Sequence, residues 1–319
     1  MEYKKLGQTN LKISVIGFGG CPISGHGWGD VKDKDSINAI HKALELGINF
    51  FDTADVYGLG HSEEILSKAL GKHRKKIVIA TKVGLRWNKK TKKTEHDLSK
   101  KHIIRAIEES LKRLRINCIP LYQIHYRDPK VPIRETMETL EKLKKQGKIQ
   151  HIGCSNFSKE LITEFQKYGR IESIQESYNI LNRKIEKKII PICNKLKIGT
   201  LVYGPLSQGL LTGKYDKKSK FDSNDRRSRN TYENFHGKKF ETNLKIIKII
   251  KKIAKKYDKT CTQMALRWIL ENPSITSVIV GAKNPKQITE NVKAIEWKLN
   301  NKDKKTIDKV VINIYEKKF

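Results

Sequence analysis

Short apolar runs of strand length alternate with amphipathic stretches of helix length along almost the whole chain. The strand-like runs cover residues 15–18, 48–51, 77–81, 121–124, 149–153, 171–175, 200–203 and 277–280. The helix-like stretches cover residues 33–46, 62–70, 99–113, 133–146, 159–168, 184–196, 242–257 and 260–271, and another begins near 286. Repeated strand–helix alternation predicts a parallel sheet. Eight such units in about 300 residues fit a closed (β/α)8 TIM barrel better than two open sheets.

Three segments lie outside this alternation. The residues before 15 predict an N-terminal β-hairpin around a polar turn at 7–10, and residues 300–317 predict a C-terminal helix. Residues 215–240 are polar, dense in charge and without apolar periodicity. We expect a long mobile loop there, either a functional lid or a disordered insert, because loops of this length are uncommon in compact domains. No linker rich in Pro, Gly or Ser divides the chain, so residues 1–319 predict a single domain.

The chain is strongly basic, with 66 Lys and Arg against 34 Asp and Glu and a formal charge of +32. Such an excess of basic residues is found in proteins that bind nucleic acids or anionic membranes. Residues 244–257, however, read as an amphipathic helix with lysines on its outer face, which a helix packed on a core also shows. The lysines are spread along the chain, and no pattern of interleaved aromatic and basic residues stands out. We therefore favour a solvated lysine-rich surface and expect neither a specific nucleic-acid partner nor a membrane partner.

Five widely spaced cysteines without a C-x-x-C pair argue against a disulfide framework and against a zinc site. The N-terminus lacks the apolar core of a signal peptide, and no apolar run reaches the length of about 18 residues that a membrane span needs. We expect a cytoplasmic protein without a metal centre.

Four ionisable residues stand where strands two to four are expected to end, or in the loop that follows. They are Asp52, Tyr57, Lys82 and His125. The carboxyl ends of the strands carry the active site of a (β/α)8 barrel, and consecutive strands are neighbours in its wall. Each residue also has an ordinary structural explanation, as a helix cap, a wall aromatic, a solvated lysine or a core histidine. Their joint occurrence at corresponding strand ends favours a functional site.

These four residue types suit proton transfer to a carbonyl oxygen. A tyrosine with its ordinary pKa near 10 is a poor acid or base at pH 7, and we expect the ammonium of Lys82 to lower that pKa. Asp52 would hold Lys82 charged and oriented, and His125 would hydrogen-bond the substrate oxygen. The sequence lacks H-E-x-x-H and the phosphate-binding G-x-x-x-x-G-K-[ST]. The GFGG at residues 17–20 does not extend to G-x-G-x-x-G.

Longer blocks of the chain resemble the aldo-keto reductases, in particular bacterial members of the general-stress type. The blocks are YKKLGQTNLKISVIGFGG, FFDTADVYGLGHSEEILSKAL, IATKVGLRW, LYQIHYRDP, IQHIGCSNF, IQESYNILNR, YGPLSQGLLTGKY and IVGAKNPKQITENVKAI. This resemblance implies a (β/α)8 barrel that uses NADP(H) without a Rossmann domain and reduces aldehydes or ketones to alcohols. It makes Tyr57 the general acid/base, Lys82 the modulator of its pKa, Asp52 the partner of Lys82 and His125 the orienter of the carbonyl.

The resemblance also implies a set of cofactor contacts. Ser155, Asn156 and Gln175 match positions that hold the nicotinamide carboxamide, and Tyr203 matches the aromatic residue that stacks on its ring. The segment expected to wrap the pyrophosphate includes Pro205, Leu206, Gln208, Gly209 and Lys214. The residues expected at the adenosine end are Gly281, Lys283, Gln287 and Asn291, with Lys283 on the 2′-phosphate.

Two positions depart from the family pattern. Pro120 stands where members often carry the acidic residue of D-L-x-x-x-H, and Lys283 stands where arginine is frequent. Lysine meets a phosphate as a point charge without the bidentate fork, which implies a weaker preference for NADPH over NADH.

The pocket walls are expected to include Trp28, Trp87 and part of segment 215–240. We expect a monomer that acts on a small carbonyl compound. The family also contains non-catalytic regulatory subunits that bind NADP(H), which is the alternative function for this chain.

Overall fold

Eight parallel strands form a closed barrel in the computed structural model, which describes residues 1–25, 27–29, 31–88, 91 and 93–316. Around the barrel the strand order is β10-β11-β12-β3-β4-β5-β8-β9. These strands are β3 (Ile16–Gly19), β4 (Phe50–Asp52), β5 (Val78–Val83), β8 (Ile119–Ile124), β9 (Ile149–Ser155), β10 (Ser173–Ser177), β11 (Gly199–Tyr203) and β12 (Ser277–Gly281). The predicted (β/α)8 barrel is confirmed.

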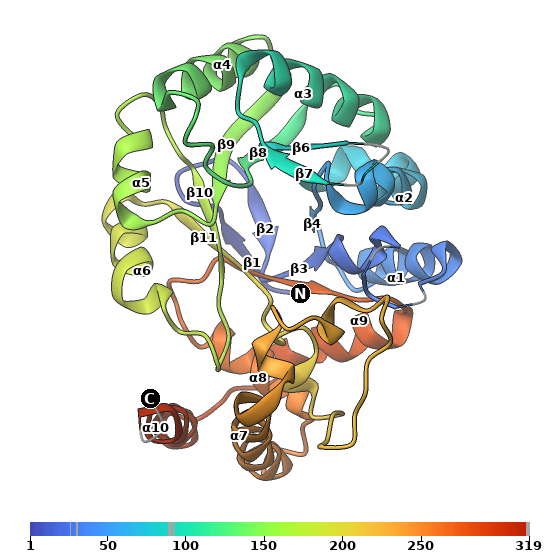
Figure 1. Cartoon of the computed structure of the whole chain (residues 1–319), viewed down its shortest axis with the longest axis vertical. Coiled ribbons are helices and arrows are strands. Elements are labelled where there is room, and N and C mark those ends of the chain that lie inside the picture. Colours follow the sequence, from blue (N-terminus) through green and yellow to red (C-terminus); the bar gives the residue numbers. More distant parts are fainter. Residues whose placement is uncertain (26, 30, 89–90, 92, 317–319) are drawn as a thin grey trace.

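The helices surround the barrel (Figure 1). They are α1 (Asp33–Glu45), α2 (His61–Leu70), α3 (Lys100–Leu114), α4 (Ile133–Lys145), α5 (Lys159–Phe165), α6 (Ile185–Leu196), α7 (Gly237–Lys255), α8 (Cys261–Leu270), α9 (Pro285–Val292) and α10 (Asn301–Glu316). Helix α3 illustrates how the sequence determines where a helix begins and which face it buries. Ser99 caps its first turn by accepting from the His102 amide, and Ile103, Ile107 and Leu111 recur on one buried face. None of the described helices is long and apolar enough to cross a membrane.

The N-terminal hairpin closes one end of the barrel. Strands β1 (Tyr3–Lys5) and β2 (Lys12–Ser14) pair antiparallel, as predicted. Leu6, Leu11 and Ile13 join an apolar cluster with side chains of the barrel interior, among them Phe50 and Leu121. The turn approaches the start of β11 so closely that a Cβ at position 7 would lie 2.8 Å from the Gly199 nitrogen. The carboxyl ends of the strands are therefore left as the open mouth.

A second hairpin lies after β5, in a part of the chain for which the sequence predicted neither a strand nor a helix. Strands β6 (Leu85–Trp87) and β7 (Thr94–His96) pair antiparallel. All three residues of β7 are exposed, so no apolar alternation marks the strand in the sequence. The hairpin extends the wall at the barrel mouth.

Segment 215–240 packs against the mouth through short 3₁₀ turns. Two of them are η5 (Arg226–Ser228) and η6 (Glu233–Phe235), and helix α7 begins at Gly237 rather than at the predicted residue 242. Phe235 is buried and meets the ring of Phe221 edge-on at 5.2 Å. A β-bridge joins Asp225 to Trp28 in the loop after β3. The mobility of this segment stays a prediction.

Candidate active site

A cavity of about 1300 Å³ opens at the carboxyl ends of the strands. It exceeds the range of about 300–1000 Å³ usual for small-molecule sites. The predicted site residues that line it are Trp28, Asp52, Tyr57, His125, Ser155, Asn156, Gln175, Tyr203, Pro205, Leu206, Gln208, Gly209, Lys214, Gly281, Lys283, Gln287 and Asn291. Lys82 is fully buried beside Asp52, and Trp87 pairs with Thr94 in the β6–β7 hairpin without lining the cavity.

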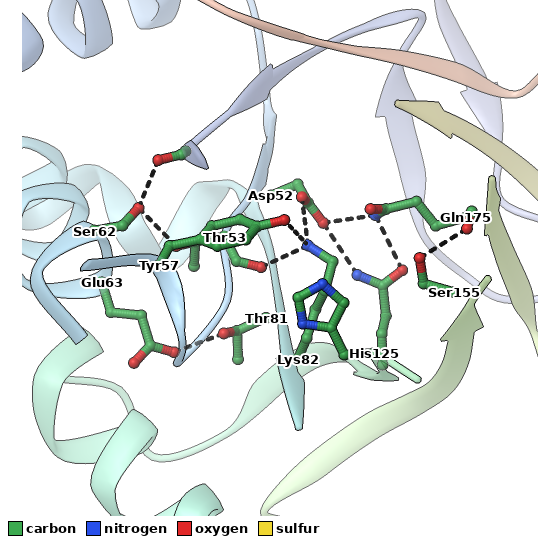
Figure 2. Close-up of polar contacts among 12 residues, drawn as sticks. Asp52, Thr53, Tyr57, Ser62, Glu63, Thr81, Lys82, His125, Ser155 and Gln175 are labelled. Atoms are coloured by element: carbon green, nitrogen blue, oxygen red, sulfur yellow. Dashed lines mark hydrogen bonds and ion pairs between the residues drawn. The ribbon is translucent and has the colours of Figure 1, made fainter. Parts of the chain in front are cut away.

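The centre of the site is a buried ion pair. Lys82 Nζ on β5 donates to Asp52 Oδ1 at the end of β4, at 2.7 Å, and also to the Thr53 carbonyl oxygen at 2.8 Å. The side chain of Lys82 is inaccessible to solvent, and that of Asp52 is 4% exposed. Parallel pairing of β4 with β5 brings the two residues together from positions 30 apart in the chain. Figure 2 shows this pair with its surrounding contacts.

Two buried amides complete the surroundings of the Asp52 carboxylate. Gln123 on β8 and Gln175 on β10 donate to Oδ2 at 3.1 and 2.7 Å. Gln175 also donates to Gln123 Oε1 at 3.2 Å. Buried charges need hydrogen-bond partners, and this network supplies them across the barrel interior. Gln123 was missed in the sequence analysis, although a polar residue two positions before His125 in an apolar strand was a usable signal.

Tyr57 reaches the ion pair from the loop after β4. Its hydroxyl lies 3.5 Å from Lys82 Nζ, and the ammonium lies 5.0 Å from the ring centroid. The turn depends on Gly58, which has φ +61°, and a Cβ there would lie 2.2 Å from the Ser24 carbonyl oxygen. Glycine is therefore required for the loop to place the phenol at the barrel mouth.

Burial holds the pKa of Tyr57 well above its ordinary value, and the neighbouring Cys21 and Asp52 raise it further. This direction is opposite to the one expected from the sequence. Lys82 lies closer to Asp52 than to Tyr57, so the ammonium is largely neutralised by the carboxylate. Desolvation of the phenolate then prevails. Tyr57 is thus a neutral phenol at pH 7, with a proton to donate.

The His125 imidazole lies beside the phenol. The two rings meet edge-on with centroids 5.8 Å apart. Burial, then the charge of Lys82, lowers the pKa of His125 well below its ordinary value, so the ring is neutral. The ring stacks on Tyr126 at 4.9 Å, and Tyr126 stacks in turn on His96 of the β6–β7 hairpin at 5.6 Å. This column fixes the plane of the imidazole.

Asp52, Tyr57, Lys82 and His125 together form a tetrad, and a chain of hydrogen bonds extends from it toward β11. The Ser155 hydroxyl donates to the Gln175 carbonyl oxygen at 2.8 Å. Asn156 donates its amide to the His125 carbonyl oxygen at 3.1 Å, and its Oδ1 accepts from the Tyr203 hydroxyl at 2.8 Å. Asn156 has φ +61°, a conformation that asparagine tolerates better than most residues. These contacts order the polar wall next to Tyr57 and His125.

The far part of the cavity is rich in cationic and amide groups. Lys214, Arg226, Arg227 and Lys283 line it. Lys283 donates to the Trp28 carbonyl oxygen, and the Arg226 guanidinium lies over the Trp28 ring at 4.8 Å. The two arginines were missed in the sequence analysis, because nothing within segment 215–240 marks which of its charges turns inward.

The residues that line this part of the cavity are suited to bind an anionic dinucleotide. Asn291 is buried in the cavity wall, and its Nδ2 has no hydrogen-bond partner among the described residues. A buried donor of this kind calls for a ligand acceptor. Cationic side chains nearby suit phosphate groups. The described part of the chain contains no group of three or more His, Cys, Asp or Glu residues arranged to hold a metal ion.

A family model described as the aldo/keto reductase family matches residues 15–312. The chain belongs to the aldo/keto reductase family. The aldo-keto reductase YhdN of Bacillus subtilis is 38% identical over 316 residues, which are 98% of this chain and 94% of that protein. The NADH-specific methylglyoxal reductase of Escherichia coli is 34% identical over 320 residues, with coverage of 95% and 96%.

Solved structures agree with this family membership. The glycerol dehydrogenase AKR11B4 from Gluconobacter oxydans matches with a TM-score of 0.90 and 36% identity, covering 98% of this chain and 95% of that chain. The family acts on small carbonyl compounds and binds a nicotinamide cofactor, so this reductase-family chain is an oxidoreductase. The general-stress subtype stays a prediction.

Proposed function

We propose that this chain reduces aldehydes or ketones to alcohols with NADPH, and that Tyr57 is the proton donor. The observation that carries the proposal is the meeting of a neutral phenol, a buried ammonium and a neutral imidazole at the open end of the barrel. A proton donor has to keep its proton until the substrate oxygen becomes basic. The raised pKa of Tyr57 meets this requirement.

The other tetrad residues position the proton and stabilise the charge that its departure creates. His125 donates its N–H to the carbonyl oxygen and aims that oxygen at the Tyr57 hydroxyl. As the proton leaves Tyr57, the Lys82 ammonium 3.5 Å away stabilises the phenolate. Asp52 holds Lys82 in place through the 2.7 Å ion pair. Solvent then returns a proton to Tyr57.

The nicotinamide cofactor, when bound, supplies the hydride for the carbonyl carbon. We propose that Ser155, Asn156 and Gln175 hold its carboxamide and that Tyr203 covers its ring. Pro205, Leu206, Gln208, Gly209 and Lys214 would border the pyrophosphate. The adenosine end would lie at Gly281, Gln287 and Asn291, with Lys283 on the 2′-phosphate. Support comes from the common cavity that these residues line and from the Nδ2 of Asn291, which lacks a hydrogen-bond partner among the residues that the structure describes.

Replacing Tyr57 with Phe tests the proposal directly. Tyr57→Phe removes the proton and keeps the ring, so kcat should fall at least about 100-fold, the usual contribution of a general acid. NADPH affinity, measured by fluorescence titration, should change less than about twofold. Tyr168→Phe is the matched control, because Tyr168 is exposed in the turn after α5 and does not line the cavity. Turnover at the wild-type rate in Tyr57→Phe would refute the role.

The alternative of a regulatory subunit predicts cofactor binding without turnover. Oxidation of NADPH, with NADH in parallel, can be followed across methylglyoxal, sugar aldehydes and aromatic aldehydes. A pure sensor should show negligible steady-state rates with every compound. The assembled tetrad favours the enzyme, because a sensor has no need of a buried ion pair beside a neutral phenol.

A further inference from the structure

The loop that carries Tyr57 is closed at its base by two buried hydroxyls. This Tyr57 loop runs from Thr53, directly after β4, to Ser62 in the first turn of α2. The Thr53 and Ser62 hydroxyl oxygens lie 2.8 Å apart, and Ser62 also donates to the Gly20 carbonyl oxygen at 2.9 Å. Because the Thr53 carbonyl oxygen accepts from Lys82 Nζ, this closure holds the start of the loop against the ammonium.

Glu63 joins the end of the Tyr57 loop to β5. Its side chain is inaccessible to solvent, and its Oε1 accepts from the Thr81 hydroxyl at 2.6 Å (Figure 2). Thr81 stands directly before Lys82, and successive side chains of a strand point to opposite faces. Lys82 therefore reaches the Asp52 carboxylate inside the barrel, while Thr81 turns outward to α2. The bond connects the backbone that places the phenol with the backbone that places the ammonium.

Arg113 on α3 holds Glu63 from the other side. Its Nε donates to Glu63 Oε2 at 2.6 Å, and its side chain is 15% exposed. Both carboxylate oxygens of Glu63 thus have a partner, as a buried charge requires. Arg113 also packs over Gly60, which has φ +102° and where a Cβ would lie 2.8 Å from Arg113 Cδ. The arginine therefore covers the end of the Tyr57 loop.

The distance that these contacts control is the one between the phenol and the ammonium. The Tyr57 hydroxyl lies 3.5 Å from Lys82 Nζ, at the outer limit of a hydrogen bond. Catalytic groups need to be held to within about 0.5 Å by the side chains behind them. A displacement of about 1 Å can lower a rate about 100-fold. A loop that is free to move away from β5 would leave the phenolate without its cation.

We propose that Ser62 and Glu63 are positioning residues for the proposed proton transfer, because they hold the Tyr57 loop against β5 and keep the phenol beside the Lys82 ammonium. The inference rests on the proposed reductase function. Both side chains are fully buried, and neither lines the cavity. They therefore act through Tyr57 and Lys82 rather than by contact with substrate or cofactor. The proposal predicts a loss of kcat without a loss of binding.

Thr81 is the best place to test the link to β5, because Glu63 also influences a second carboxyl group. Burial, followed by the charge of Glu63, raises the pKa of Asp55 on the Tyr57 loop well above its ordinary value. A substitution of Glu63 would change the ionisation of Asp55 as well. Thr81→Val removes the hydroxyl at nearly constant volume, whereas Thr81→Ser keeps the hydroxyl and loses a methyl group. Ser62→Ala opens the base of the loop independently and decides the question if Thr81→Val does not fold.

The matched control is Thr139→Val. Thr139 is also buried, and its hydroxyl donates to the Glu135 carbonyl oxygen at 2.8 Å within α4, which carries no residue of the tetrad. All variants are assayed with NADPH and the carbonyl compound that the wild type reduces fastest. The measured quantities are kcat, the KM of the carbonyl compound, the Kd of NADPH from fluorescence titration and the urea midpoint of unfolding.

In Thr81→Val and Ser62→Ala, kcat should fall about tenfold or more, while KM and the Kd of NADPH should change less than about twofold. In Thr81→Ser and Thr139→Val, kcat should change less than about twofold even where the urea midpoint falls. An unchanged kcat in Thr81→Val or Ser62→Ala, an equal loss in Thr81→Ser, or losses that follow the urea midpoint across all variants would overturn the positioning role. Absence of turnover in the wild type would instead refute the reductase function itself.

Discussion

The buried pair of Asp52 and Lys82 allows a quantitative test of how the site is held together. Asp52→Asn leaves the Lys82 ammonium fully buried without its 2.7 Å counter-charge. It also places an amide where Gln123 and Gln175 now donate to a carboxylate oxygen. Lys82→Met creates the converse defect, a buried carboxylate supported only by amides. Each single substitution leaves one uncompensated charge in the barrel.

Breaking a buried ion pair by removing one partner costs about 3–5 kcal/mol, because the remaining charge stays desolvated. We expect each single substitution to lower the free energy of unfolding by about that amount. The double variant Asp52→Asn/Lys82→Met removes both charges, and its loss should be smaller than the sum of the two single losses. The coupling free energy should be about 2–3 kcal/mol. Lys82→Met and the double variant should lose turnover, since no ammonium then stabilises the Tyr57 phenolate.

Urea unfolding of the four proteins, followed by circular dichroism, gives the coupling free energy. The exposed pair Lys42 and Glu45 on α1 is a matched control, with a side-chain distance of 2.8 Å. Its double-mutant cycle should give less than about 0.5 kcal/mol, as for other exposed helical pairs. Losses at Asp52 and Lys82 that add within about 0.5 kcal/mol would show that the pair is not energetically coupled and would refute the argument.

Two further predictions concern the half-buried carboxyl of Glu176 and the cofactor. Burial raises the pKa of Glu176 to about 7, so the stability that its protonated form provides is lost as pH rises from about 4.5 to 7. Glu176→Gln keeps the acceptor for the Phe157 amide and should stabilise the protein at pH 8 by about 3 kcal/mol; equal urea midpoints of the two proteins at pH 8 would contradict this. Lys283→Ala should weaken NADPH at least about tenfold more than NADH in fluorescence titrations, whereas equal losses would exclude contact with the 2′-phosphate.

The sequence predicted the barrel because eight apolar runs separated by amphipathic helices have few other ways to bury their faces. It also predicted where to look for chemistry, since Asp52, Lys82 and His125 stand at the ends of consecutive strands. It did not predict the β6–β7 hairpin, whose exposed strand β7 lacks apolar alternation. Nor did it show that Arg226 and Arg227 line the cavity, because long-range packing selects which charges of a polar segment turn inward.

The chain by itself determined which groups meet at the barrel mouth, through strand order and through Gly58, which lets Tyr57 turn inward. Only the tertiary structure decided their protonation. Residue types alone suggested an ammonium that acidifies a tyrosine. The folded site instead neutralises Lys82 with Asp52 and removes water from Tyr57, so the phenol keeps its proton. Desolvation and charge pairing depend on distances and burial in three dimensions, which residue types and their spacing do not contain.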